Sequence, residues 1–169
     1  MAEEIINRVA NSKLKTIDLE EFYPDGKRVL FDLKDWLYEG LVLREKDFRQ
    51  GLASHDWSAY KDCYVALHCS TDAIVPAWAY MLVSVYLEPF AKRTVIGTLT
   101  DLETSIYQNI IHQLDIVEFE NMPVIIKGCS NKPVPPSAYV MITNKLKPIA
   151  KSIMYGEACS SVPLFKNKK

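Results

Sequence analysis

The chain has 169 residues, of which 49% are hydrophobic and 24% charged, an ordinary composition for a globular protein. The net charge of −1 is spread along the chain, so we expect no basic face for nucleic acid. The start, MAEEIINRV, lacks a signal segment, and the most apolar stretch, residues 73–87, is shorter than the roughly 20 residues that span a bilayer. These features predict a cytoplasmic protein, with no membrane as its partner.

The first third of the chain has mixed secondary-structure signals. Residues 15–19 and 27–33 are typical of strands, and the sequence YPDGK between them is typical of a turn, because Pro24 presets φ and Gly26 accepts a positive φ. Short helices are expected over 34–40 and 44–56. We interpret this part as a mixed N-terminal extension, residues 1–60.

From residue 62 onward the pattern is regular. Buried-looking strand runs alternate with helical stripes, and Pro148 should kink or end the last helix. In chain order, we expect a strand at 63–69, a helix at 73–88, a strand at 93–98, a helix opened by a capping box of Thr100 and Glu103, a strand at 123–128, a helix at 135–151 and a strand at 152–156.

This alternation predicts the fold class. Strand–helix–strand units give a mainly parallel sheet with right-handed crossovers and helices on both faces. No period of 20–50 residues repeats. We therefore expect a single α/β domain over residues 1–169, with its βα core at 61–165 behind the N-terminal extension. The order of the strands does not follow from the sequence.

Three of the four cysteines begin similar stretches. These stretches are CSTDAIVP (69–76), CSNKPVP (129–135) and CSSVP (159–163), and each follows a predicted strand. The carboxyl ends of parallel strands open at one edge of a sheet, where α/β proteins place ligands. We therefore expect Cys69, Cys129 and Cys159 to converge.

The chemistry of thiolates supports a shared site. Cys69 and Cys129 are predicted to lie directly before helices, whose positive N-terminal ends stabilise a thiolate. Three thiolates suit zinc or an iron–sulfur cluster. Asp72, three residues after Cys69, is the nearest carboxylate for the fourth position, which water or a residue of a partner could fill instead. The sequence thus predicts a metal site of Cys69, Cys129, Cys159 and Asp72.

Other interpretations stay open. Unpaired cysteines are often simply buried, and Ser and Pro are common in loops that lead into helices. Asp72 could be a helix N-cap, and Cys63, at the start of a strand, is expected to be structural. The competing functions are a cysteine-nucleophile enzyme for sulfur or acyl transfer, and an interaction module whose cysteines are packed.

Longer segments resemble a known family. EEIINRVANSKLKTIDLEEFYP, CSTDAIVPAWAYML, KGCSNKPVPPSAY and AKSIMYGEACSSVPLFK together are similar to an uncharacterised bacterial family, domain of unknown function 2480. The similarity covers nearly the whole chain and matches the family pattern at Cys69, Cys129 and Cys159. The resemblance implies an accessory role in handling iron, sulfur or clusters, with iron–sulfur assembly proteins as partners.

Overall fold

The structure, a computed structural model, describes residues 13–128, 131–157 and 159–167. The chain divides into two compact units, which we call unit 1 (residues 1–23 and 107–169) and unit 2 (24–106). Unit 2 is thus inserted into the sequence of unit 1. Helices alternate with strands that pair mainly in parallel, which confirms the predicted α/β class.

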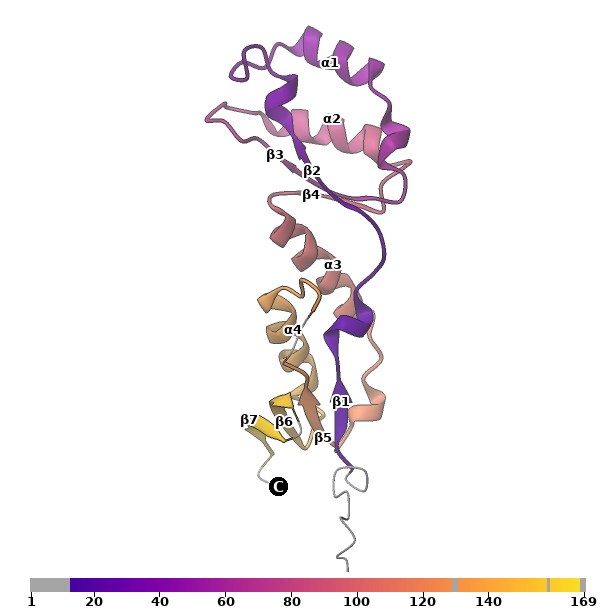
Figure 1. Cartoon of the computed structure of the whole chain (residues 1–169), viewed down its shortest axis with the longest axis vertical. Coiled ribbons are helices and arrows are strands. Elements are labelled where there is room, and N and C mark those ends of the chain that lie inside the picture. Colours follow the sequence, from indigo (N-terminus) through magenta and orange to yellow (C-terminus); the bar gives the residue numbers. More distant parts are fainter. Residues whose placement is uncertain (1–12, 129–130, 158, 168–169) are drawn as a thin grey trace, which may run out of the picture. The chain divides into compact units, whose positions relative to one another are not determined.

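Unit 2 is a three-stranded parallel sheet between helices (Figure 1). Its order is β2-β3-β4, and β2 supplies Phe31 and β3 supplies Val65 and Leu67 to a core shared with α1 and α2. The opposite face carries Arg28, which bonds to the first half of α3. The elements are β2 (Arg28–Asp32), α1 (Glu45–Ser54), β3 (Tyr64–His68), α2 (Ala77–Leu87), β4 (Arg93–Ile96) and α3 (Leu99–Gln113).

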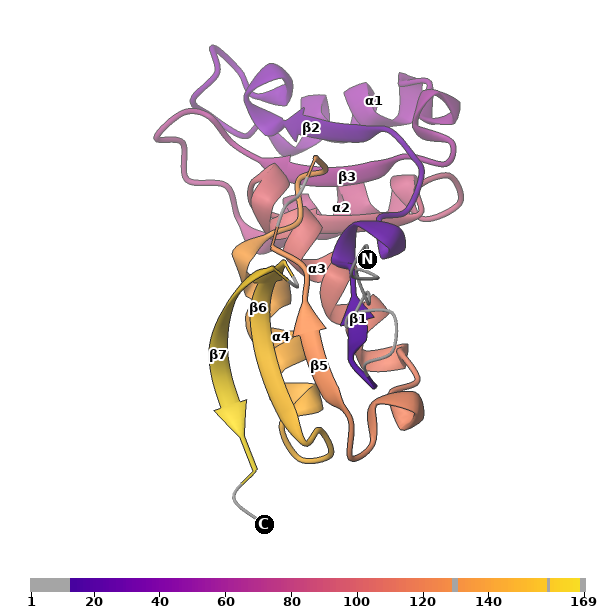
Figure 2. The ribbon, with the colours of Figure 1, turned by 60° about the horizontal axis from the view of Figure 1, so that its bottom comes forward.

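Unit 1 is a four-stranded sheet of order β1-β5-β6-β7, in which only β7 is antiparallel (Figure 2). Its core joins Val124 and Ile126 of β5 with Ile142 of α4 and with Tyr107 and Ile111 from the second half of α3. The elements are β1 (Lys15–Ile17), β5 (Pro123–Ile126), α4 (Pro136–Leu146), β6 (Ser152–Glu157) and β7 (Ser160–Lys166).

Short 3-10 helices flank the first two strands of each sheet. η1 (Leu19–Phe22) follows β1 and η2 (Leu33–Trp36) follows β2. η3 (Trp57–Tyr60) precedes β3, and η4 (Val117–Phe119) precedes β5. Both units therefore have one order of elements: strand, 3-10 helix, α-helix, 3-10 helix, strand, α-helix, strand.

The two units share one order of elements, and the sequence shows a corresponding repeat. Residues 48–97 align without a gap with residues 107–156, at an offset of 59. α2 and α4 begin and end at this offset, and α1 and α3 end at it. Eleven of the 50 aligned pairs are identical: Asp56/Asp115, Val65/Val124, Val75/Val134, Pro76/Pro135, Ala79/Ala138, Tyr80/Tyr139, Leu87/Leu146, Pro89/Pro148, Ala91/Ala150, Lys92/Lys151 and Gly97/Gly156.

Backbone details repeat as well. Asp62 and Asn121 occupy equivalent positions before β3 and β5, with φ of 60° and 56°. Both residues donate their N–H to the carbonyl of the residue before the shared alanine, 91 or 150, at 3.0 Å and 2.9 Å. Gly97 and Gly156 have φ of 137° and 121°, a region that favours glycine. Such paired local conformations are expected of two copies of one fold.

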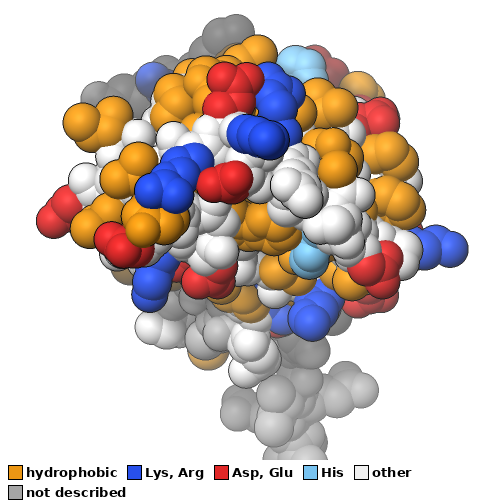
Figure 3. Space-filling view, turned by 90° about the horizontal axis from the view of Figure 1, so that it is seen from above, with side chains coloured by type: hydrophobic (Ala, Val, Ile, Leu, Met, Phe, Trp, Pro, Cys, Tyr) orange, Lys and Arg blue, Asp and Glu red, His pale blue; other side chains and the backbone are white. Residues whose placement is uncertain are grey.

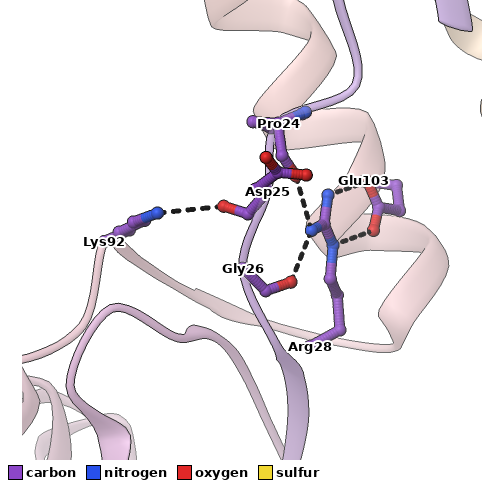
Figure 4. Close-up of polar contacts among 6 residues, drawn as sticks. All are labelled: Pro24, Asp25, Gly26, Arg28, Lys92 and Glu103. Atoms are coloured by element: carbon purple, nitrogen blue, oxygen red, sulfur yellow. Dashed lines mark hydrogen bonds and ion pairs between the residues drawn. The ribbon is translucent and has the colours of Figure 1, made fainter.

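The copies diverge after their last shared strand. Unit 1 continues into β7, whereas unit 2 continues into the first half of α3. There the Arg28 guanidinium donates to Glu103 at 2.7 Å and to the carbonyls of Pro24 and Gly26, each also at 2.7 Å (Figure 4). Glu103 is buried, so its charge requires this partner. The Arg28 contacts join the start of unit 2 to α3.

The structure corrects several expectations. The predicted strands divide between two sheets instead of one, and residues 15–32 are not an extension, since β1 and β2 each pair with a strand of the expected core. The helix expected at 34–40 is the single turn of η2. The predicted capping box is also displaced: Asp101 Oδ2 accepts the Thr98 N–H at 2.7 Å, and the Thr98 Oγ1 accepts the Asp101 N–H at 3.2 Å.

Two surface properties complete the description. In the described part of the chain, no helix has the length and apolar character needed to cross a membrane. Seen from the side of α1, acidic and basic side chains lie interspersed with hydrophobic ones (Figure 3).

Candidate functional site

The carboxyl edge of the unit 1 sheet, which we call the unit 1 edge, is held by an ion pair. Asp18 follows β1 and Lys127 follows β5, and their side chains meet at 2.8 Å. Burial acts to raise the pKa of Asp18, but the hydrogen bond from Lys127, the N–H of Glu20 and the charge of Lys127 outweigh it, so the pKa lies below its ordinary value of 3.8. The hydrogen bond and charge of Asp18 raise the pKa of Lys127.

The loop after β5 is tied to this edge on both sides of its cysteine. The Glu20 carboxylate accepts the backbone N–H groups of Asn131 and Lys132, the latter at 3.0 Å. Gly128 lies against the ring of Tyr155 on the neighbouring strand β6, where a Cβ would come within 2.9 Å of the ring. Cys129 itself lies outside the described residues. The described residues on either side of it thus belong to the unit 1 edge.

Cys159 lies in the turn between β6 and β7, where it is exposed. β5 and β6 are parallel neighbours, with Ile126 opposite Tyr155. The segments that follow these two strands, one holding Cys129 and the other Cys159, therefore start from adjacent points of the unit 1 edge.

The unit 2 edge, at the ends of β2 and β3, repeats this arrangement with different side chains. Asp32 accepts the N–H of Lys34 at 3.0 Å and that of Ser70 at 3.1 Å, and its Oδ2 lies 3.7 Å from His68 Nε2. Burial acts to raise the pKa of Asp32, but the hydrogen bonds from Ser70 and Lys34 and the charge of His68 outweigh it and lower the pKa. Asp32 is therefore an anion at neutral pH.

Cys69 follows β3 at this edge and is half-buried. Its Sγ lies 3.4 Å from Thr71 Oγ1, and the Thr71 hydroxyl donates to the Gly40 carbonyl at 2.7 Å. Because that hydroxyl has only one proton to donate, the sulfur contact fits a thiol that donates to Thr71 Oγ1. The prediction that Cys69 lies directly before a helix is wrong, since α2 begins at Ala77, eight residues later, and a helix dipole acts only over the first turn.

The Asp pairs of the two edges occupy equivalent places. Asp18 and Asp32 each cap a 3-10 helix, through the N–H two residues on. Each also pairs with a residue at the carboxyl end of the neighbouring strand: Lys127, which directly follows β5, or His68, the last residue of β3. Because both units have this aspartate pair, the shared fold is sufficient to explain it. Sequence reasoning missed both aspartates, although the repeated pattern of an apolar residue, Asp and Leu, at 17–19 and 31–33, marks them.

The predicted ligands are divided between the two units, and Cys129 lies outside the described residues. No group of three His, Cys, Asp or Glu side chains in that part of the chain could hold a metal ion. Cys69 and Asp72 belong to unit 2, and Cys159 belongs to unit 1. Asp72 is exposed, and the N-cap of α2 is Pro76, so Asp72 is not that cap. Cys63 is buried in the unit 2 core, as predicted for a structural cysteine.

Comparison with known proteins identifies the family. The model of the family described as "Protein of unknown function (DUF2480)" matches residues 3–167, nearly the whole chain. The chain belongs to this family. The match includes all four cysteines and both units, so the duplicated plan lies within a single family domain. No curated protein and no solved structure matches the chain.

Proposed function

We propose that the chain binds a transition-metal ion or an iron–sulfur cluster through cysteine thiolates at the unit 1 edge, with Cys129 and Cys159 as ligands. The observation that carries this proposal is the parallel pairing of β5 with β6, because each strand is followed by one of the two cysteines. Thiolates bind zinc and iron–sulfur clusters in preference to hard cations.

The comparison between the units supports this choice of site. In unit 2 the strand equivalent to β6 is β4, which is followed by Gly97 and Thr98 without a cysteine. The segments that follow β5 and β6 thus carry two cysteines, whereas those that follow β3 and β4 carry one. The common fold needs no second cysteine there, so Cys159 is free to serve a function. Its exposure leaves the sulfur accessible to a metal.

Cys69 and Asp72 complete the proposed ligand set on the strength of the sequence signature alone. Zinc or an iron–sulfur cluster is the proposed cofactor, and the family resemblance supports iron–sulfur assembly proteins as partners. The proposed location is the cytoplasm, where reducing conditions keep thiols available as ligands.

The test is metal analysis of protein purified without oxygen. We expect about one equivalent of metal in the wild type, and loss of it in Cys129→Ala and in Cys159→Ala. Cys63→Ala is the matched control, because Cys63 is buried in the unit 2 core, and it should retain the metal. Cys69→Ala decides whether the third cysteine is a ligand. Circular dichroism of each variant tests whether the fold is intact.

Reconstitution distinguishes a cluster from zinc. Anaerobic addition of iron and sulfide should give a brown species with charge-transfer absorption in the wild type and in Cys63→Ala, and a colourless Cys159→Ala. Metal-free protein with one rapidly alkylated thiol would contradict the proposal and favour a cysteine nucleophile. Thiols that react only after denaturation would instead indicate packed cysteines in an interaction module.

A further inference from the structure

Unit 2 contains two cavities that share a wall. One has a volume of about 490 Å³ and the other of about 320 Å³, and Asp35, Trp36 and His55 line both. The larger cavity is completed by residues from η2, the following loop and α1, and the smaller one by the end of β2 and by Tyr60 of η3. These three residues form the shared wall, in which the indole of Trp36 is the largest side chain; we call this wall the partition.

At the equivalent place in unit 1 the aromatic and imidazole part of this wall is apolar, whereas Asp32 and Asp35 have acidic counterparts, Asp18 and Glu21. The offsets between the copies match Trp36 with Phe22, His55 with Leu114 and Tyr60 with Phe119. Phe119 belongs to the unit 1 core, and Phe22 and Leu114 are partly buried and pack against it. The same fold is thus completed there by hydrocarbon and aromatic side chains without polar atoms. The imidazole, the hydroxyl and the indole N–H of unit 2 are consequently not requirements of the fold.

The charges that line the two cavities favour a cation. Three carboxylates are present, those of Asp32, Asp35 and Asp47, and every residue between 13 and 128 is described. Within that range no hydrogen bond or ion pair involves the carboxylate of Asp35 or Asp47. The linings also hold the imidazole of His55 and the guanidinium of Arg44, which lies over the ring of Tyr38 at 3.2 Å from its centroid. An anionic ligand would therefore meet more negative than positive charge.

The partition is rigid and aromatic. The Trp36 ring stacks on Phe31 at 5.5 Å and meets His55 edge-on at 5.0 Å, which fixes its orientation. Gly51 of α1 approaches the indole so closely that a Cβ would lie 3.4 Å from it. Indole is the best side-chain partner for a cation, and its attraction adds to that of a nearby carboxylate.

We propose that the paired cavities around Trp36 bind an aliphatic ammonium ion, with a linear polyamine as the ligand that spans both. Its ammonium groups pair with Asp35 and with Asp32 or Asp47, and its methylene chain lies against the aromatic partition. This site is distinct from the proposed metal site, since none of the proposed metal ligands lines either cavity.

The experiment is calorimetric titration of the full chain with spermidine. The wild type should bind saturably, and Asp35→Asn should weaken binding about two- to fivefold, because it removes one exposed carboxylate partner of an ammonium group. Glu88→Gln is the matched control: it removes one exposed carboxylate from unit 2 at the end of α2, outside the cavities, and should bind as the wild type does.

Two further measurements guard against a purely ionic effect. Most of the spermidine binding should persist when magnesium chloride replaces a monovalent salt at the same ionic strength. Asp35→Asn/Asp47→Asn should bind spermidine more weakly than Asp35→Asn alone. Asp35, Asp47 and Glu88 are all exposed, so the variants with Asn or Gln at these positions are expected to fold. Equal affinity of Asp35→Asn and the wild type, or complete competition by magnesium, would overturn the proposal.

Discussion

Unit 1 and unit 2 share one plan but carry different chemistry. Both have an aspartate at or directly after the end of their first strand, where it caps a 3-10 helix. Both also bury an Ala, an aliphatic residue and a Leu along the helix that crosses the sheet. The differences lie at the edges: unit 1 has a second cysteine, whereas unit 2 has paired cavities around Trp36. The shared residues therefore report what the fold requires, and the unshared ones report what it leaves free for function.

The largest effect tests the shared core. Leu87 in α2 and Leu146 in α4 are equivalent and have no exposed surface. We expect Leu87→Ala and Leu146→Ala each to lower the free energy of unfolding by about 2–5 kcal/mol, since each leaves a cavity. Urea unfolding followed by circular dichroism measures the loss, and hydrogen exchange assigns it to a unit. A loss below about 1 kcal/mol in either variant would show that the copies do not share one packing requirement.

A somewhat smaller effect tests the paired glycines. A Cβ on Gly156 would lie 2.6 Å from the Ser160 carbonyl oxygen, and one on Gly97 would lie 2.5 Å from the Asp101 carboxylate. Both positive φ values also disfavour alanine. We expect Gly156→Ala and Gly97→Ala to destabilise by about 1–3 kcal/mol each. Gly156→Ala should cost more, because the backbone it meets moves less easily than the Asp101 side chain. The reverse order would contradict this account.

The ion pair at the unit 1 edge gives a pH-dependent effect. The pKa of Asp18 is lowered, so its contribution to stability is present above 3.8 and is lost as the pH falls below 3.8 through the folded-state pKa. The pKa of Lys127 is raised, so its contribution to stability is present below pH 10.5 and is lost as the pH rises above 10.5 through the folded-state pKa. Asp18→Asn keeps a capping side chain and removes the charge.

We expect Asp18→Asn to lower the free energy of unfolding by up to about 1 kcal/mol at neutral pH, because Lys127 is 40% exposed and solvent screens the pair. The difference from the wild type should shrink as the pH falls below 3.8. Asp32→Asn is the sister variant in unit 2. If the difference in unfolding free energy between Asp18→Asn and the wild type persisted in acid, the charge of Asp18 would not be its cause.

Local pattern was sufficient to predict most elements. The buried strand at 64–68 and the helices around Leu87 and Leu146 have strong apolar runs, and Pro148 ends α4 as predicted, two residues after Leu146. The division into two sheets was not predictable from such runs, because it depends on pairings such as Ile17 with Ile126, more than 100 residues apart. The repeat was not predicted either, since its offset of 59 exceeds the usual repeat lengths and only eleven of its 50 pairs are identical.

The sequence was less informative about the sites. It identified Cys69, Cys129 and Cys159 by their shared signature, but the loops before α2 and α4 separate the first two from the helix ends that were expected to activate them. Nothing in residue type or spacing indicated the cavities around Trp36. They depend on the packing of η2 against α1, and become visible as a functional difference only beside the apolar residues of unit 1.

The variant with the smallest expected effect on stability tests the difference between the two units most directly. His55→Leu with Tyr60→Phe gives unit 2 the residues that unit 1 has at these positions, Leu114 and Phe119. It removes both partners of the 3.3 Å contact between His55 Nε2 and the Tyr60 hydroxyl. Replacing both partners with apolar groups is nearly neutral, so the free energy of unfolding should change by less than about 0.5 kcal/mol.

Spermidine binding should nevertheless fall in this double variant, because the branched aliphatic side chain introduced at position 55 fills space beside Trp36 and the polar rim of both cavities is reduced. Calorimetry and urea unfolding of the same preparation separate the two quantities. The single variant Tyr60→Phe serves as the comparison, since it leaves His55 in place at the wall that both cavities share. If the double variant unfolded far more easily than the wild type, His55 and Tyr60 would be needed by the fold of unit 2, and their absence from unit 1 would no longer point to a ligand.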